Sequence, residues 1–237
     1  MNIVFLHGLF GSPDNWQGVV GYLDHMQHSF HIPHLPIDDS APRDYKTFGG
    51  IDGLTEFVEE YIYNNGLEQV IIGGNSLGGQ IAINYAARNP HTTKALILTG
   101  SAGLYERSLN KGSTKAKRSY EEIASIAAEI FYDKDNCTQE IIDTAYRMLT
   151  DRQYARFLIK VAKATRDHNV ESLLDDLNME TLLVWGRQDV VTPEDVAKRF
   201  HAKIKRSELI FIEECGHCPP LEKPLALATI IEDFLNG

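Results

Sequence analysis

The chain has 237 residues, of which 43% are hydrophobic and 24% charged, as in ordinary folded proteins rather than disordered or fibrous ones. Its formal net charge of -10 at pH 7 argues against a nucleic-acid partner, because duplex binding depends on clustered Lys and Arg side chains that neutralise phosphates. No stretch approaches the roughly 20 apolar residues that a membrane-spanning helix requires, so we expect no membrane partner.

The start of the chain and the cysteine content indicate a location. An apolar run opens the sequence, but His7 and Gly8 interrupt it and no basic segment precedes it, so we expect no signal peptide. Three cysteines, an odd number and few for this length, indicate a reduced, cytoplasmic protein.

Six short runs rich in β-branched residues alternate with helical patterns along most of the chain. Each run is nearly all apolar rather than alternating, which is typical of parallel strands buried on both faces. The pattern predicts an α/β fold with a mostly parallel sheet of about six strands and helices on both faces. The expected strands are residues 2–6, 29–33, 69–73, 95–99, 182–185 and 208–212.

Several helix starts have recognisable signals. Ser12-Pro13 and Thr192-Pro193 each place a hydroxyl before a proline, and we expect both hydroxyls to cap the helix that follows. Pro224 opens the last predicted helix in a similar way.

The alternation of strands and helices breaks once, where about 80 residues without a strand-like run follow the fourth strand. We interpret residues 101–180 as a helical lid inserted into a core of residues 1–100 and 181–237. The lid is expected over the carboxyl edge of the sheet, where open α/β sheets bind ligands. Its predicted helices cover residues 119–132, which start with a capping box of Ser119 and Glu122, then 138–149, 152–166 and 170–177.

The sharpest local signal is a Gly-x-Ser-x-Gly sequence from Gly74 to Gly78, placed between a predicted strand and a predicted helix. Glycines at both ends let strand and helix approach closely, while Ser76 occupies a strained turn that presents its hydroxyl above the sheet edge. The N–H of Leu77 lies in the first helical turn and is expected to stabilise an oxyanion. The alternative is a structural turn with an idle serine. A phosphate loop is excluded because the turn has neither a Gly-Lys-Ser/Thr ending nor a Gly-x-Gly-x-x-Gly sequence.

A serine hydroxyl becomes nucleophilic only when a base removes its proton. Of nine histidines, His217 follows the last predicted strand and so shares the carboxyl edge with Ser76. Asp189, four residues after the fifth predicted strand, is expected at the same edge to orient the imidazole. Its competitor Asp195 falls inside a predicted helix, and a plain loop carboxylate is the alternative for Asp189. The order Ser, Asp, His is that of one hydrolase architecture.

The loop after the first strand is expected to supply the second oxyanion donor. Its glycines permit a close turn that leaves the N–H of Leu9 as first choice and that of Phe10 as second, with a structural turn as the alternative. We expect apolar residues of the lid and of the loops near Ser76 to form the walls of a substrate pocket. Apolar residues of this kind nevertheless belong to the core more often than they contact a ligand. The candidates are Phe10, Leu77, Leu104, Tyr105, Phe131, Tyr154, Phe157 and Val190.

Together these segments resemble the α/β-hydrolase family, specifically its lidded esterase-like branch, over nearly the whole chain. The segments that match are His7-Gly8, the run from Gly74 to Gly79, the run from Gly186 to Asp189, and the run from Gly216 to Pro224. The resemblance implies no cofactor. It implies Ser76 as nucleophile, His217 as general base and acid, Asp189 as its orienting partner, and the Leu9 and Leu77 amides as oxyanion hole.

Two features depart from the resemblance. The chain starts at the first strand, where family members usually carry an extra hairpin, and His34 stands where similar proteins commonly have Asp. Neither departure affects the predicted catalytic triad of Ser76, Asp189 and His217. We therefore predict a serine hydrolase that cleaves a small ester-like substrate through an acyl-enzyme.

Other activities on the same residues stay open. The resemblance also covers carbon-carbon bond hydrolases of vinylogous diketones, whose elbow similarly reads Gly-Asn-Ser-x-Gly-Gly, and a lyase of menaquinone biosynthesis. A ligand sensor that retains the triad is a further alternative. The lid entrance carries Arg107, Lys111, Lys115, Lys117 and Arg118, which indicate either an anionic substrate or a solvated loop.

Two rival motifs are disfavoured. Cys215 and Cys218 form a Cys-x-x-Cys that resembles disulfide oxidoreductases of the thioredoxin family, but it lies in the last unit of a long chain rather than near the start of a roughly 100-residue fold. Four histidines recur every third residue, but their stretch crosses from a helix end into a strand, so no single face would hold them and we expect no metal. They are His25, His28, His31 and His34.

Overall fold

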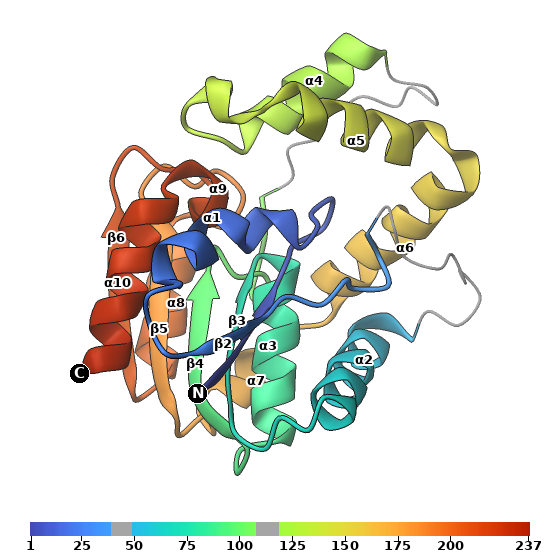
Figure 1. Cartoon of the computed structure of the whole chain (residues 1–237). Helices are drawn as coiled ribbons and strands as arrows, with labels where there is room; N and C mark the ends of the chain where they lie inside the picture. Colours follow the sequence, from blue (N-terminus) through green and yellow to red (C-terminus); the bar gives the residue numbers. More distant parts are fainter. Residues whose placement is uncertain (39–48, 108–118) are drawn as a thin grey trace.

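A computed structural model describes residues 1–38, 49–107 and 119–237 of the chain (Figure 1). Within them lies one six-stranded, fully parallel sheet in the order β2-β1-β3-β4-β5-β6, which confirms the predicted fold class. The strands are β1 (Asn2–Leu6), β2 (Ser29–His31), β3 (Val70–Asn75), β4 (Thr93–Thr99), β5 (Glu180–Gly186) and β6 (Ser207–Ile212).

Strand β2 ends two residues before the predicted boundary. It lies at the edge of the described part of the sheet, where it pairs with β1. Pro33 has no backbone N–H to donate, so it is poorly suited to extend the ladder. The prediction of a strand over 29–33 was therefore too long.

Helices cover both faces of the sheet, as Figure 1 shows. On one face, α1 and α10 pack together, and Trp16 stacks on Phe5 of β1 with ring centroids 4.2 Å apart. On the other face, α2, α3 and α8 enclose the larger apolar core. The helices of the two faces are α1 (Asp14–Leu23), α2 (Gly50–Asn64), α3 (Leu77–Arg88), α8 (Glu194–Lys203), α9 (Pro219–Glu222) and α10 (Pro224–Asn236).

The order of the strands creates one crevice at the carboxyl edge. Strand β2 lies on one side of β1, and β3 lies on the other. The connections that leave the carboxyl ends of β1 and β3 therefore run in opposite directions. The register pairs Leu6 with Gly74, which brings the loop after β1 beside the turn after β3. Open α/β sheets bind ligands at such a switch point.

The elements between β4 and β5 include α4 (Tyr120–Glu129), η1 (Lys134–Asn136), α5 (Gln139–Thr150), α6 (Arg152–Asp167) and α7 (Glu171–Leu174). Figure 1 shows α4 and α5 beyond the end to which the strand arrows point, and α6 descending towards α2. Ser119 caps helix α4 and forms the predicted capping box with Glu122. Helix α7 packs on α3 and α8. In the part of the chain that the structure describes, no helix has the length and apolar character needed to cross a bilayer.

Candidate active site

Ser76 stands on a strained turn between β3 and α3. Its backbone has φ 55° and ψ -120°, a conformation that a residue with a side chain rarely adopts. A Cβ on Gly74 would come within 2.2 Å of Gly78, and one on Gly78 within 2.2 Å of the Leu6 carbonyl oxygen. Glycine at these two positions therefore permits the close approach of strand and helix that lifts Ser76 above the sheet edge.

The loop after β1 lies against this turn. A Cβ on Gly8 would come within 3.3 Å of the Ser76 Cβ, and the Gly11 N–H donates to the Gly8 carbonyl at 3.1 Å to close a tight turn. Phe10 has φ 64° within that turn. The loop that carries Leu9 therefore lies beside Ser76, while the Leu77 amide begins α3, where a helix has no internal acceptor for it.

His217 and Asp189 form a direct pair. Asp189 Oδ2 lies 2.9 Å from His217 Nδ1, and both side chains are buried. Asp189 Oδ1 accepts hydrogen bonds from the Val191 N–H at 2.8 Å and the Thr192 N–H at 2.9 Å. These donors fix the carboxylate, which in turn orients the imidazole.

Asn75 links the turn that carries Ser76 (the serine turn) to the loop after β6 that carries His217 (the histidine loop). Its side-chain amide donates to the Thr99 carbonyl at 2.9 Å and to the His217 carbonyl at 3.1 Å. Between the described residues no hydrogen bond joins the Ser76 hydroxyl to the imidazole. Catalytic hydrogen bonds are often long in free enzymes and tighten when substrate binds, so this geometry is compatible with a triad.

The electrostatic surroundings of His217 favour its protonated form. Burial disfavours the imidazolium, but the charge and hydrogen bond of Asp189, together with the charges of Glu106 and Glu222, outweigh burial and raise the pKa of His217. An imidazole of this kind can hold a proton taken from a serine hydroxyl.

Thr192 was predicted as the cap of α8, and this expectation was wrong. Helix α8 has no side-chain cap, and the buried Thr192 hydroxyl donates instead to Asp189 Oδ2 at 2.9 Å. A hydrogen bond donated to a charged carboxylate is stronger than one between neutral groups. Thr192 is therefore a further support of the pair, which the Thr-Pro sequence alone did not reveal.

Glu222 was assigned no role from the sequence. It is buried on α9, and its carboxylate accepts three backbone hydrogen bonds. Two donors belong to the histidine loop, the Gly216 N–H at 2.9 Å and the Cys218 N–H at 3.0 Å; the third is the Tyr132 N–H at 2.8 Å, just after α4. The His217 N–H also donates to the carbonyl of Ile130 at 2.8 Å. Glu222 thus fixes the histidine loop and joins it to the segment after α4.

The expected wall residues occupy different environments. Phe10 and Val190 are each 42% exposed, and Leu104 is half-buried. Tyr105 is exposed, and its hydroxyl donates to Asp195, the competitor of Asp189. Phe131 is buried against two cysteines. The remaining residues are buried in the main core, namely Leu77, Tyr154 and Phe157.

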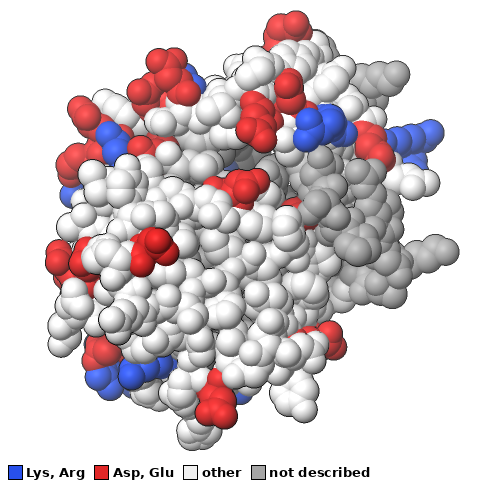
Figure 2. All heavy atoms as spheres, viewed as in Figure 1, with Lys and Arg blue, Asp and Glu red and all other residues white. Residues whose placement is uncertain are grey.

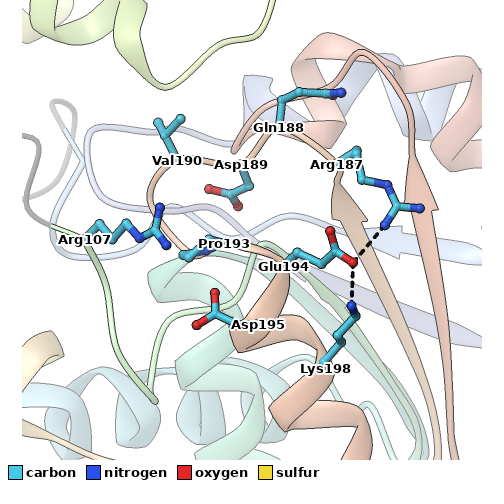
Figure 3. A pocket seen from close by; sticks show the side chains of 9 residues that line it. All are labelled: Arg107, Arg187, Gln188, Asp189, Val190, Pro193, Glu194, Asp195 and Lys198. Carbon is cyan, nitrogen blue, oxygen red and sulfur yellow. Dashed lines mark ion pairs between the residues drawn. The ribbon is translucent and has the colours of Figure 1, made fainter.

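A surface hollow of about 590 Å³ borders the loop after β5 that carries Asp189, here called the acid loop (Figure 3). Figure 3 shows Glu194 between Arg187 and Lys198, whose side-chain nitrogens lie 3.2 and 2.7 Å from its carboxylate. Ser76 and His217 are not among the lining residues. The hollow therefore lies behind the acid loop rather than over the serine.

The rival motifs gain no support from the geometry. Burial raises the pKa of both Cys215 and Cys218, which opposes formation of the thiolate that redox chemistry requires. The regularly spaced histidines diverge, since His25 pairs with Glu232 and His34 with Asp38. Of the five basic residues at the predicted lid entrance, Arg107 is described; the rest lie outside the described residues, namely Lys111, Lys115, Lys117 and Arg118.

Comparison with known sequences identifies the family. The sequence model of the alpha/beta hydrolase family matches residues 3–230. The chain belongs to this family. Among curated relatives of the hydrolase, human monoacylglycerol lipase ABHD6 is 25% identical over 99% of this chain and 75% of its own length. The 2-hydroxy-6-oxo-2,4-heptadienoate hydrolase of Pseudomonas putida is 26% identical over 71% of this chain and 64% of its own length.

Among solved structures, the hydrolase resembles MGS-MChE2, an alpha/beta hydrolase enzyme from the metagenome of sediments of the Mar Chica lagoon, Morocco. The two are 27% identical with a TM-score of 0.78, and the match covers 100% of this chain and 90% of the other. The family and fold predicted from the sequence are thereby confirmed.

Proposed function

We propose that this hydrolase cleaves carboxylic esters through an acyl-enzyme formed on Ser76, with His217 as general base and acid and Asp189 as its orienting partner. The observation that carries the proposal is the buried His217–Asp189 pair, 2.9 Å apart, held through Asn75 beside a serine at φ 55°. Chemically, this arrangement activates an alcohol at a sheet edge.

The chemistry proceeds in two balanced halves. The Ser76 oxygen attacks the ester carbonyl as its proton passes to His217 Nε2, and the Leu9 and Leu77 amides donate to the oxyanion. When the tetrahedral intermediate collapses, the imidazolium gives that proton to the departing alkoxide. Water then repeats the sequence on the acyl-enzyme, releasing the acid and restoring Ser76.

The choice of an ester bond is supported by the similarity to a monoacylglycerol lipase, whose named substrate is an uncharged ester. Residues 101–180 would form the lid over this site, with α4 and α5 beyond the carboxyl edge of the sheet. The apolar residues Leu104 and Phe10 lie on the loops after β4 and β1, where a lid would enclose an acyl chain.

A second candidate is hydrolysis of a carbon-carbon bond. The Pseudomonas relative is named for a dienoate, a substrate with a carboxylate group. The elbow of this chain, Gly-Asn-Ser-Leu-Gly-Gly, also carries the asparagine expected for that branch. On this alternative the same serine and histidine would act on a ketone rather than an ester.

Active-site labelling tests the shared chemistry. Wild-type protein is treated with a fluorophosphonate and mapped by peptide mass, beside Ser76→Ala and the control Ser125→Ala, an exposed serine on α4. We expect the label on Ser76 in wild type and in the control, and none in Ser76→Ala. Label elsewhere would contradict the assignment.

Turnover then separates the two substrates. A panel of neutral esters of graded acyl length is compared with a vinylogous diketone that bears a carboxylate. We expect ester turnover that Ser76→Ala abolishes and that replacement of both Cys215 and Cys218 by Ser leaves within about tenfold of wild type. Diketone cleavage without ester cleavage would replace the first candidate by the second.

A further inference from the structure

The segment after β4 crosses the proposed site. The Ala102 N–H donates to the Ser76 carbonyl at 3.0 Å, and the Arg107 N–H donates to the Val191 carbonyl at 2.8 Å, so the segment is fixed to the serine turn at one end and to the acid loop at the other. Between these anchors lies Glu106, which belongs to no recognisable sequence motif.

The carboxylate of Glu106 lies within electrostatic reach of His217 and Asp189, while its two neighbours are exposed. Tyr105 is exposed and bonds to Asp195 on α8, and Arg107 is exposed and lines the hollow behind the acid loop. Glu106 is half-buried, and its carboxylate interacts electrostatically with both His217 and Asp189. Burial raises its pKa, as expected for a carboxylate taken partly out of water.

Among the described residues, the charged groups that act on the pKa of His217 are acidic. They are Asp189 from the acid loop, Glu106 from the loop after β4 and Glu222 from α9. Arg166 supplies a positive charge to Glu106, but its side chain is 69% exposed, so solvent screens it strongly. Asp and Glu side chains also border the hollow below the upper helices on the face shown in Figure 2. A substrate anion bound beside His217 would therefore meet negative charge.

We propose that Glu106 is a specificity-determining residue that makes this site select uncharged esters and reject substrates carrying an anionic group near the scissile bond. This inference rests on the proposed function. It separates the two candidate substrates, because an ester of an uncharged acid and alcohol escapes the repulsion and a carboxylate-bearing diketone does not. Like charges placed together disfavour binding strongly in a partly buried site.

Matched ester pairs test the inference. Each pair shares one acyl group and one leaving group and differs by a sulfonate, carried on the acyl end in one pair and on the leaving group in the other. Wild type should favour the neutral ester in at least one pair by about tenfold or more in kcat/KM. Glu106→Gln should raise kcat/KM for that anionic ester about tenfold and leave the neutral ester nearly unchanged. The control Glu129→Gln, an exposed carboxylate on α4, should match wild type.

The pH dependence supplies a reading that a merely structural role would not give. A sulfonate stays charged, and His217 affects both esters of a pair equally, so the ratio of their kcat/KM values reports on Glu106. Because the Glu106 pKa is raised, protonation should relieve the discrimination as the pH falls from 8 towards 5 in wild type. In Glu106→Gln the ratio should not change with pH. Equal ratios in wild type and Glu106→Gln at every pH would overturn the inference.

A measurement without turnover keeps this inference distinct from the proposed function. The His217 imidazole is titrated by NMR in wild type and in Glu106→Gln, and its pKa should be lower in the variant. An unchanged His217 pKa overturns the role of Glu106 whether or not esters are cleaved. A lowered pKa in a protein that cleaves no ester would support the facing charge while ester cleavage itself fails.

Discussion

Two buried histidines follow strands at the same edge of the sheet, and their surroundings differ. His7 follows β1 and is fully buried, and His217 follows β6 and is 5% exposed. Each lies near an aspartate. His217 Nδ1 is 2.9 Å from the Asp189 carboxylate, whereas His7 Nε2 is 3.8 Å from Asp38.

Their pKa values shift in opposite directions. Burial dominates at His7 and lowers its pKa, although the Gly8 carbonyl and Asp38 act against burial. At His217 burial also disfavours the charge, but the direct hydrogen bond and the surrounding carboxylates prevail. Burial alone therefore does not identify a base. A buried imidazole that is also hydrogen-bonded to a buried carboxylate is the better candidate, because the carboxylate stabilises the imidazolium that a base must form.

Replacing each histidine should separate a base from a structural residue most clearly. His217→Ala should lower kcat for an ester by about 10⁵-fold or more, since the serine loses its base. His7→Gln should keep kcat within about tenfold and reduce stability by about 1–3 kcal/mol, because buried polar groups lose their partners. Ester kinetics and chemical denaturation measure both. Similar losses of kcat in the two variants would erase the distinction.

Replacing Asp189 should lower kcat far more than replacing Asp38, as for the two histidines beside them. Asp189→Asn keeps the shape of the side chain but replaces an acceptor of the His217 Nδ1–H by an amide, so kcat should fall by about 10⁴-fold. Asp38→Asn should change kcat by less than about tenfold. The comparison is made at pH 8, above the ordinary imidazole pKa of about 6.5. A loss at Asp38 as large as that at Asp189 would show that the two pairs do not differ in role.

Glu222 tests whether more distant carboxylates contribute to the basicity of His217. Removing its charge in Glu222→Gln should lower the His217 pKa and move the acid limb of kcat/KM to lower pH. Lost backbone hydrogen bonds to the histidine loop should also reduce kcat by about 10-fold or more. The control is Glu214→Gln, an exposed carboxylate in the same loop. An unmoved acid limb would limit Glu222 to holding the backbone.

The fold could be predicted because its signals are local. Strands buried on both faces are continuous apolar runs, and the two close approaches at the serine turn require glycine at 74 and 78. Asp189 and His217 were inferred from their positions just after strands, because the ends of parallel strands meet at one edge. The structure pairs them, while the catalytic role of Ser76 stays a prediction.

The residues that the sequence did not reveal act across long separations. Thr192 carries the same signal as a helix cap, and only the position of Asp189 shows where its hydroxyl donates. Glu222 bonds to Tyr132, 90 positions away, and Tyr154 to the Ile37 carbonyl, 117 positions away. No local spacing encodes such contacts. Tyr154 lies in the core, and its place in a pocket wall stays a prediction.

The smallest expected effect is the pH dependence of stability, which should have opposite signs for the two histidines. The folded pKa of His7 is lowered, so its contribution is present above its unfolded pKa of about 6.5 and is lost as the pH falls. The folded pKa of His217 is raised, so its contribution is complete below about 6.5 and is lost as the pH rises through the folded pKa.

Denaturation curves from pH 5 to 9 measure both contributions as differences from wild type. One proton changes the slope by at most about 1.4 kcal/mol per pH unit. His7→Gln should therefore lose less stability than wild type on acidification, because it no longer contains a buried imidazole whose protonation destabilises the folded state. His217→Gln should instead flatten the alkaline side of the curve. If both variants changed the same limb, the two histidines would share one electrostatic environment, and the distinction between a base and a structural residue would fail.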